Sequence, residues 1–227
     1  MCLYKIFRPL LFSIDAERAH HLTLKALQYG LVPPVGVIVD PALEMNLWGL
    51  RFPNPVGLAA GFDKNAQVLG PMFHLGFGFV EVGTVTPRPQ EGNPRPRIFR
   101  DAQNNAVINR MGFPGGGVKI FRENLERFLE KEKKPRGVIG INIGMNKDQT
   151  DPAADYALLI RALGKLADYL CVNISSPNTP GLRNLQEPAA LRDLIAALHE
   201  ARGAARPPLL VKLAPDLDDG QIENLAQ

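Results

Sequence analysis

The segment YLCVNISSPNTPG, residues 169–181, passes from a continuous apolar run into a loop with two amides, three hydroxyls and two prolines. A run that is apolar at every position is typical of a strand buried on both faces, as in a parallel sheet covered by helices. The polar loop is either a turn chosen for its backbone geometry or a site that binds a small polar molecule. The choice depends on how the other strands of the chain end.

Four more apolar runs of this kind occur, and helix-like stretches alternate with them. The predicted strands are 56–60, 79–85, 138–143, 169–174 and 209–213, and the predicted helices are 65–75, 117–132, 152–167 and 187–202. This alternation is typical of two α/β architectures, a doubly wound sheet and a (β/α)8 barrel.

Polar or glycine-rich residues follow every predicted strand, at 61–65, 83–86, 142–146, 173–181 and 212–216. A doubly wound sheet concentrates its ligand groups at one switch point, whereas a barrel gathers residues from many strand ends on one face. The glycine-rich nucleotide motifs and the hydrolase motif G-x-S-x-G are absent. We therefore predict a (β/α)8 TIM barrel, of which about five of the eight βα units are present.

Composition narrows the class of protein. With 45% hydrophobic and 22% charged residues the chain is globular, and a net charge of +3 does not indicate a nucleic-acid partner. Its two cysteines, Cys2 and Cys171, indicate no disulfide framework, which suits a reducing compartment. We find neither a signal peptide nor an apolar run of the roughly 18 residues that a membrane span needs.

The first forty residues predict a separate pair of helices. One apolar stripe has helical spacing and consists of Leu3, Ile6, Phe7, Leu10, Leu11 and Ile14. A second helix is expected to begin near Ser13 or Asp15 and to carry Ala19, Leu22, Ala26 and Leu27 on its apolar face. Such a pair either packs on the body of the protein or lies on a membrane surface. We divide the chain into a helical extension, 1–40, and a barrel, 41–227.

The strand ends carry amides, hydroxyls and two lysines, namely Lys64, Thr84, Asn109, Asn142, Asn173, Ser175, Ser176, Asn178 and Lys212. Hydrolysis by a carboxylate pair and binding of a divalent metal are both disfavoured, because this set contains no carboxylate, histidine or cysteine. Amides suit a planar ring with alternating N–H and C=O groups. The lysines favour an anionic ligand or negative charge that develops during a reaction.

Six strings of the sequence resemble dihydroorotate dehydrogenase, in its class 2, quinone-dependent branch. They are NPVGLAAGFDKNA (54–66), GFGFVEVGTVTPRPQEGNPRPRIFR (76–100), INRMGF (108–113), GINIG (140–144), NISSPNTPGLR (173–183) and VKLAPD (211–216). The resemblance implies a (β/α)8 barrel with FMN at the strand carboxyl ends. It also implies oxidation of dihydroorotate to orotate, with a quinone as electron acceptor, in the pyrimidine (UMP) pathway.

The resemblance also implies roles for individual residues. Ser176 would be the catalytic base, assisted by Thr179 and a water relay. The substrate would contact Lys64, Asn109, Arg110, Met111, Gly112, Phe113, Asn173 and Asn178. FMN would contact Ala59, Ala60, Gly61, Lys64, Thr84, Asn142, Asn173 and Lys212. His20 and Arg100 would lie near the quinone, and no metal is implied.

Two alternatives stay open on the sequence alone. The first is a soluble, class 1-like flavoprotein that uses fumarate or NAD, although class 1 relatives have a cysteine where this chain has Ser176, and lack the extension. The second is an inactive truncated fragment, because a barrel of about 250 residues that starts near residue 54 should continue past Gln227 and build its phosphate site there. On this reading the chain alone would not hold FMN. We further expect residues 1–40 to form a lid around a quinone tunnel on a peripheral membrane protein, at the cytoplasmic face of the cell membrane if the source is bacterial.

Overall fold

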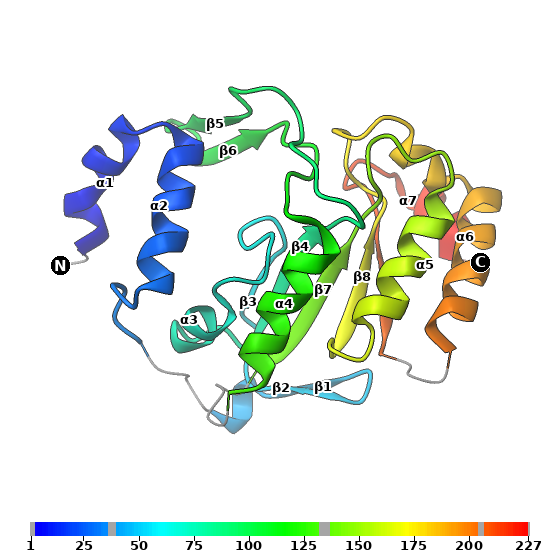
Figure 1. Ribbon diagram of the computed structural model, residues 1–227, viewed down its shortest axis with the longest axis horizontal. Coiled ribbons are helices and arrows are strands. Elements are labelled where there is room, and N and C mark those ends of the chain that lie inside the picture. The colour runs from blue at the N-terminus through cyan, green and yellow to red at the C-terminus, as the bar shows by residue number, and fades with distance from the viewer. Residues whose placement is uncertain (1–2, 36–39, 132–136, 204–206, 227) are drawn as a thin grey trace.

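The structure is a computed structural model that describes residues 3–35, 40–131, 137–203 and 207–226, without the side chains of residues 3–7. Its centre is a parallel sheet whose five strands follow one another in chain order (Figure 1). The strands are β3 (Gly57–Leu58), β4 (Phe79–Val85), β7 (Val138–Ile143), β8 (Tyr169–Asn173) and β9 (Leu209–Lys212). Sequential parallel order is the order of a barrel, not of a doubly wound sheet.

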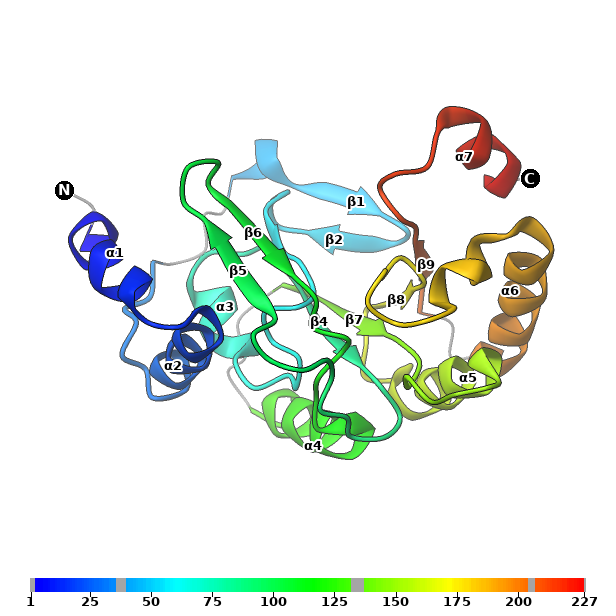
Figure 2. The ribbon, with the colours of Figure 1, turned by 90° about the horizontal axis from the view of Figure 1, so that it is seen from above.

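Helices connect these strands and lie on one side of the sheet (Figure 2). They are α3 (Leu69–His74), α4 (Gly117–Leu129), α5 (Pro152–Leu163) and α6 (Pro188–Arg202). The α7 helix (Asp219–Ala226) follows β9, and short 3-10 turns occur at η1 (Pro41–Leu43) and η2 (Leu182–Gln186). The architecture is therefore α/β with consecutive βα units, as predicted, and the described strands do not close into a full barrel.

The two faces of the sheet carry different side chains because neighbouring residues of a strand point to opposite sides. Val80, Ile141 and Val172 are fully buried in the main core, between the sheet and the helices. The other face carries a smaller apolar cluster that includes Tyr169 and packs against Phe52. Phe52 belongs to a hairpin of β1 (Met45–Leu47) and β2 (Leu50–Phe52) that covers the amino end of this inner face.

Large and small residues alternate across the inner face. Gly57 pairs with Phe79 in adjacent strands, and Gly140 pairs with Tyr169. A Cβ atom added to either glycine would lie 2.1 Å from the neighbouring ring. These glycines are required because the aromatic rings occupy the space that any larger side chain would need.

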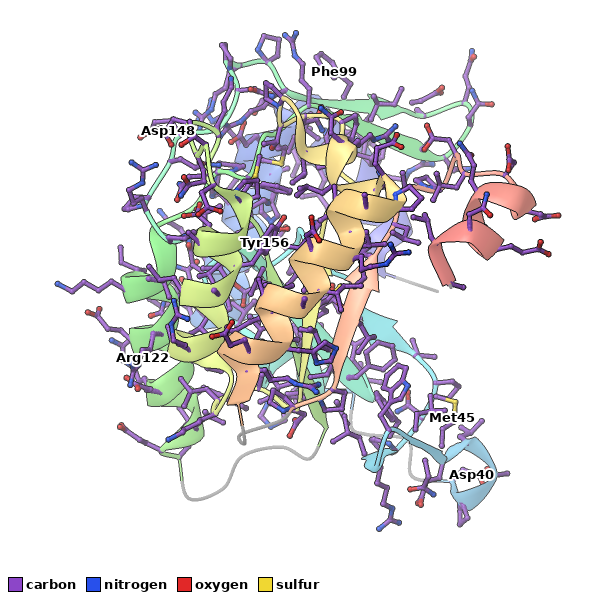
Figure 3. All side chains as sticks on the ribbon, turned by 90° about the vertical axis from the view of Figure 1, so that its right-hand side faces the viewer. Asp40, Met45, Phe99, Arg122, Asp148 and Tyr156 are labelled. Atoms are coloured by element: carbon purple, nitrogen blue, oxygen red, sulfur yellow. The ribbon has the colours of Figure 1, made fainter. Side chains whose placement is uncertain are left out.

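A second hairpin, of β5 (Ile98–Asp101) and β6 (Ala106–Asn109), lies at the opposite end of the molecule from β1–β2, as the positions of Phe99 and Met45 in Figure 3 show. The extension packs beside it, with α1 (Leu3–Ser13) and α2 (Ala16–Gln28) (Figure 1). Asp15 caps α2 by accepting a hydrogen bond from the Arg18 backbone N–H at 2.9 Å. Of the two predicted caps, Asp15 is therefore correct, since the Ser13 hydroxyl donates to the Leu10 carbonyl instead.

Two local predictions need correction, one hairpin was not predicted, and three predicted side chains lie outside the described part of the chain. Leu22 is 52% exposed, and Leu24 takes its place in the core. The strand expected at 56–60 covers only Gly57–Leu58, and the β5–β6 hairpin was not predicted. The side chains of Leu3, Ile6 and Phe7 lie outside the described part of the chain.

The helix expected at 65–75 is shorter, and the reason is Asp63. Its buried carboxylate accepts hydrogen bonds from the backbone N–H groups of Asn65, Gln67 and Val68. These bonds hold residues 63–68 in a compact loop, so α3 begins only at Leu69. Side-chain acceptors of this kind compete with the helix for backbone donors. Burial raises the pKa of Asp63.

Candidate active site

A cavity of about 790 Å³ lies at the carboxyl ends of the sheet strands. Side chains from the sheet form its floor, and α2 with the β5–β6 hairpin forms its roof. It brings together most of the predicted site residues, namely His20, Ala60, Gly61, Lys64, Thr84, Arg100, Asn109, Met111, Gly112, Phe113, Asn173, Ser176, Asn178 and Lys212. Ala59, Arg110 and Asn142 are not among its lining residues.

The floor is built from three polar residues on adjacent strands, Thr84, Asn142 and Asn173. The Asn173 amide donates to the Thr84 hydroxyl at 3.2 Å and to the Asn142 amide oxygen at 3.1 Å. The Thr84 hydroxyl in turn donates to the Asn142 amide oxygen. Asn142 is fully buried and therefore supports the other two from below instead of touching the cavity. Its predicted contact with a cofactor stays a prediction.

The loop that follows β8 makes local turns and also lines the cavity. The Asn173 side chain accepts from the Ser175 backbone N–H at 3.2 Å and from its hydroxyl at 2.9 Å, and Asn178 N–H donates to the Ser176 hydroxyl oxygen at 3.2 Å. These are the local turns expected of Asx and Ser residues. Ser175, Ser176 and Asn178 also line the cavity. The Thr179 hydroxyl is buried and has no hydrogen-bond partner among the described residues.

One wall of the cavity is formed by the end of β6 and the residues after it. Asn109 accepts from the Met111 N–H at 3.3 Å, and the Gln90 amide donates to the carbonyls of Gly112 and Phe113 at 3.1 Å. Gly112 has φ +68°, and a Cβ there would lie 2.9 Å from the Asn93 side chain. Gln90 and the glycine together hold this wall in place.

The charged groups at the cavity have distinct environments. Lys64 donates to the Gly61 carbonyl, and its burial lowers its pKa to about 8. Burial, and next the nearby Lys64 charge, also lower the pKa of His20. His20 Nε2 lies 2.7 Å from the Phe62 carbonyl oxygen, so this nitrogen carries the proton of the neutral ring.

The roof is held by charged groups. Arg97 donates to Glu17 on α2 through Nε and through Nη2, the latter at 2.6 Å, and the two side chains are each 6% exposed. Arg100 donates to the Ile14 carbonyl at 2.8 Å, and its guanidinium lies 4.8 Å from the centre of the Phe12 ring. These contacts fix α2 over the cavity. They also lower the pKa of Glu17, mainly through its hydrogen bond from Arg97.

Two predicted residues lie near the cavity without lining it. Arg110 donates to the Pro96 carbonyl at 3.1 and 2.9 Å, away from the lining set. Ala59 precedes the lining residues Ala60 and Gly61. Their predicted contacts with substrate and cofactor stay predictions.

Sequence reasoning missed several residues that shape the site, among them Asp63, Glu81, Gln90 and Asn93. Each is polar and acts through backbone groups or through another side chain. A lone carboxylate in an apolar run, such as Glu81 in FVEVGTV, is the one signal that was visible. Among the described residues no cluster of three or more His, Cys, Asp or Glu side chains could hold a metal ion, and no helix has both the length and the apolar character to cross a bilayer.

Comparison with known proteins identifies relatives along the whole chain. A protein of Rhodospirillum rubrum named dihydroorotate dehydrogenase (quinone) is 54% identical over 99% of this chain and 61% of its own length. One of the same name from Novosphingobium aromaticivorans is 54% identical over 100% of this chain and 65% of its own length. The chain thus spans less than two thirds of the length of these curated relatives.

The fold has close counterparts among solved structures. The crystal structure of DHODH from Eimeria tenella in complex with ferulenol superimposes with a TM-score of 0.88 at 40% identity, over 96% of this chain and 66% of that chain. The sequence model of the dihydroorotate dehydrogenase family matches residues 42–227. From these matches and from the geometry of the cavity, we conclude that the chain belongs to the dihydroorotate dehydrogenase family.

Proposed function

We propose that the protein to which this chain belongs oxidises dihydroorotate to orotate in pyrimidine synthesis, with FMN bound in the cavity and a quinone as electron acceptor. The observation that carries the proposal is that one cavity joins the amide- and lysine-rich strand ends to His20 and Arg100 at the roof. The names of the two relatives, both dihydroorotate dehydrogenase (quinone), support the same reaction.

The residues of the cavity fit a flavin. A Cβ added to Gly61 would meet nothing within 4 Å, so open space adjoins the backbone there and a flat ring could approach it closely. Thr84 and Asn173 offer polar atoms at the floor, and Lys64 and Lys212 offer positive charge. FMN, when bound, would supply hydride acceptance and onward electron transfer. Ala60, Gly61, Lys64, Thr84, Asn173 and Lys212 would hold it, supported from below by Asn142.

The protein's own residues would handle the proton and orient the substrate. Ser176 would take the proton from the substrate carbon, and its hydroxyl oxygen is already oriented by the Asn178 N–H at 3.2 Å. A serine hydroxyl is a weak base and needs a further acceptor. The unpartnered Thr179 hydroxyl, three residues along the same loop, is the group we assign to that relay. The amides of Asn109 and Asn178 would hydrogen-bond the pyrimidine ring, and Asn173, whose amide bonds Thr84, Asn142 and Ser175, would line the site beside it.

The extension would bring the quinone to the cavity. Leu10, Leu22, Tyr29 and Leu31 are large apolar side chains of residues 1–35 that are each more than half exposed. Exposed apolar side chains on an amphipathic helical pair are typical of proteins that lie on a membrane surface. We therefore propose peripheral membrane association, with His20 and Arg100 beside the quinone.

The test compares electron acceptors. Flavin-loaded protein, prepared as this chain and also with the further length that its relatives have, is given dihydroorotate with ubiquinone or menaquinone analogues, with fumarate, or with NAD. Turnover with a quinone analogue and not with fumarate or NAD is expected. Turnover with fumarate or NAD alone would replace the proposal with a class 1-like activity.

A further inference from the structure

Glu81 lies on β4, on the inner face of the sheet, directly beneath the floor. Its Oε1 accepts a hydrogen bond from the Asn142 amide at 2.8 Å, and its Oε2 accepts from the Tyr169 hydroxyl at 3.0 Å. Nothing in the proposed reaction uses this carboxylate. Its position below Asn142 nevertheless determines which atoms the floor presents to the cavity.

The argument starts from the chemistry of the groups. A carboxylate can only accept hydrogen bonds, so the amide nitrogen of Asn142 must face Glu81. The Asn142 oxygen then faces the other way, toward Thr84 and Asn173. Both N–H bonds of Asn173 are used on Thr84 and Asn142, and its oxygen accepts from Ser175. The N–H and O–H groups of this network therefore donate to Glu81 or to one another, and none of them is directed into the cavity.

The direction of these hydrogen bonds determines which polar atoms the floor offers to a ligand. The Thr84 hydroxyl gives its single proton to Asn142, and the Ser175 hydroxyl gives its proton to Asn173. Both hydroxyls line the cavity, and each has a lone pair left and no proton to donate. The floor thus presents hydrogen-bond acceptors at these two positions.

We propose that Glu81 is a positioning residue that sets this direction through Asn142, so that the ligand edge seated on the floor must carry N–H donors. Reversing the Asn142 amide would turn its nitrogen toward Thr84 and Asn173, and both hydroxyls would have to reorient. Leaving such a buried donor or acceptor unpaired weakens binding by about tenfold. The part of the inference that concerns affinity rests on the proposed function, whereas the part that concerns the network does not.

The titratable groups around Glu81 come from β8 and β9, which are adjacent to each other in the sheet. The Tyr169 hydroxyl and the Cys171 thiol lie on β8, and the charge of Lys212 on β9 opposes the rise in the pKa of that thiol. Burial, followed by the Glu81 charge, raises the pKa of Cys171 to about 12 and also raises that of Tyr169. Both groups therefore stay protonated at neutral pH.

A polarity swap tests the network in the chain itself, without flavin. In Asn142→Asp two carboxyl groups face each other and retain one proton between them. Because the folded state then binds more protons than the unfolded state, the stability of this variant should fall as pH rises from about 5 to about 8. In the double variant E81Q/N142D the glutamine amide donates to the new carboxylate at position 142. That carboxylate still accepts from Thr84 and Asn173, so the pH dependence should disappear.

Urea unfolding of the parent, E81Q, N142D and E81Q/N142D at several pH values measures this. Equal pH slopes for N142D and the double variant would overturn the proposal, and so would a double variant that does not fold at any pH. If only N142D fails to fold at high pH, that result supports it.

The second measurement is orotate affinity in the flavin-loaded protein, followed through the flavin spectrum. E81Q, whose side chain can donate as well as accept and so no longer fixes the Asn142 amide, should weaken orotate binding by about tenfold. The double variant, in which position 142 can only accept from Thr84 and Asn173, should restore binding to within about twofold of the parent. Tyr169→Phe is the control, because it removes the hydroxyl on the other carboxylate oxygen and leaves the Asn142 bond intact. An equal loss in the control, or no recovery in the double variant, would contradict the positioning role. A parent that binds no orotate counts against the proposed function, and the unfolding series then decides the inference.

Discussion

The floor and the roof enclose one cavity but are attached to the protein in different ways. Neutral hydrogen bonds among Thr84, Asn142 and Asn173 connect the floor to strands whose other face is buried in the main core. The roof depends on charged groups, above all the Glu17–Arg97 pair, and carries exposed apolar side chains. Buried apolar contacts respond weakly to pH, whereas a buried ion pair fails when one partner is neutralised. We therefore expect the roof to loosen under conditions that leave the floor intact.

The largest effect should come from breaking the buried pair. Glu17→Gln leaves the Arg97 charge buried without its partner, and such losses amount to about 3–5 kcal/mol. Hydrogen exchange followed by mass spectrometry should show much faster exchange for α2 and unchanged exchange for α5. Glu44→Gln is the control, because the Arg51 side chain that it leaves unpaired is 72% exposed, so the loss of this pair should matter little. Faster exchange in α5 as well would mean that roof and floor unfold together.

The same pair predicts an acid response. Since the pKa of Glu17 is lowered from its ordinary value of 4.5, its contribution to stability is complete above that value and is lost as pH falls below it. We expect α2 to lose protection in hydrogen exchange at a higher pH than α5 does. In Glu17→Gln this difference in pH between α2 and α5 should be absent.

Next in size is the loss of the proposed base. Ser176→Ala should slow reduction of the flavin by dihydroorotate by at least about 10²-fold, while flavin stays bound, because a general base contributes that much. Rapid mixing in a single turnover measures this step. Reoxidation of the reduced protein by a quinone analogue serves as the internal control and should keep its rate, since the proposed quinone residues, His20 and Arg100, lie at the roof. Unchanged flavin reduction would remove Ser176 from the mechanism.

A smaller effect should follow from the Lys64 charge. Because its pKa is about 8, the ammonium is charged at pH 7 and largely neutral at pH 9. Affinity for the orotate anion should therefore fall about tenfold between these pH values. Lys64→Arg, which keeps its charge throughout, should bind with little pH dependence. A parent whose affinity is flat across this range would show that Lys64 does not meet the anion.

The smallest effect should come from one hydrogen bond that holds the backbone of the floor residue Asn173. The buried Tyr156 hydroxyl, inside the helix layer on α5, donates to the Asn173 carbonyl at 2.9 Å. Tyr156→Phe should lower the free energy of unfolding by about 1 kcal/mol without changing exchange in α2. Tyr29→Phe, at a residue that is 77% exposed, should change neither quantity. Urea unfolding and hydrogen exchange together check both statements.

The sequence predicted most of the sheet because its strands are nearly continuous apolar runs, as is typical of strands buried on both faces. The β5–β6 hairpin was not predicted, because residues such as Val107 and Ile108 are largely exposed. Without a buried face, the sequence shows no alternation of apolar and polar residues there. Asp63 escaped for a different reason. Its acceptors hold backbone groups within five positions along the chain, and composition does not reveal such local bonds.

For the candidate site, too, some residues could be predicted from the sequence pattern and others could not. Residues at strand ends, such as Thr84 and Asn173, were found from the residues alone, because a barrel gathers strand ends on one face. His20 and Arg100 were assigned only by resemblance, since they come from segments outside the sheet. Sequence could not separate Asn142, buried below the cavity, from Asn173 beside it, because both are amides near the carboxyl end of a strand.

Tyr169 restricts how this protein could change during evolution. Its ring fills the space beside Gly140, and its hydroxyl donates to Glu81. A substitution that suits one of these neighbours disturbs the other, so the three positions cannot drift independently. Accepted changes at residues 81, 140 and 169 should arise together across a lineage, and a library that varies one of them alone should return mostly the parental residue.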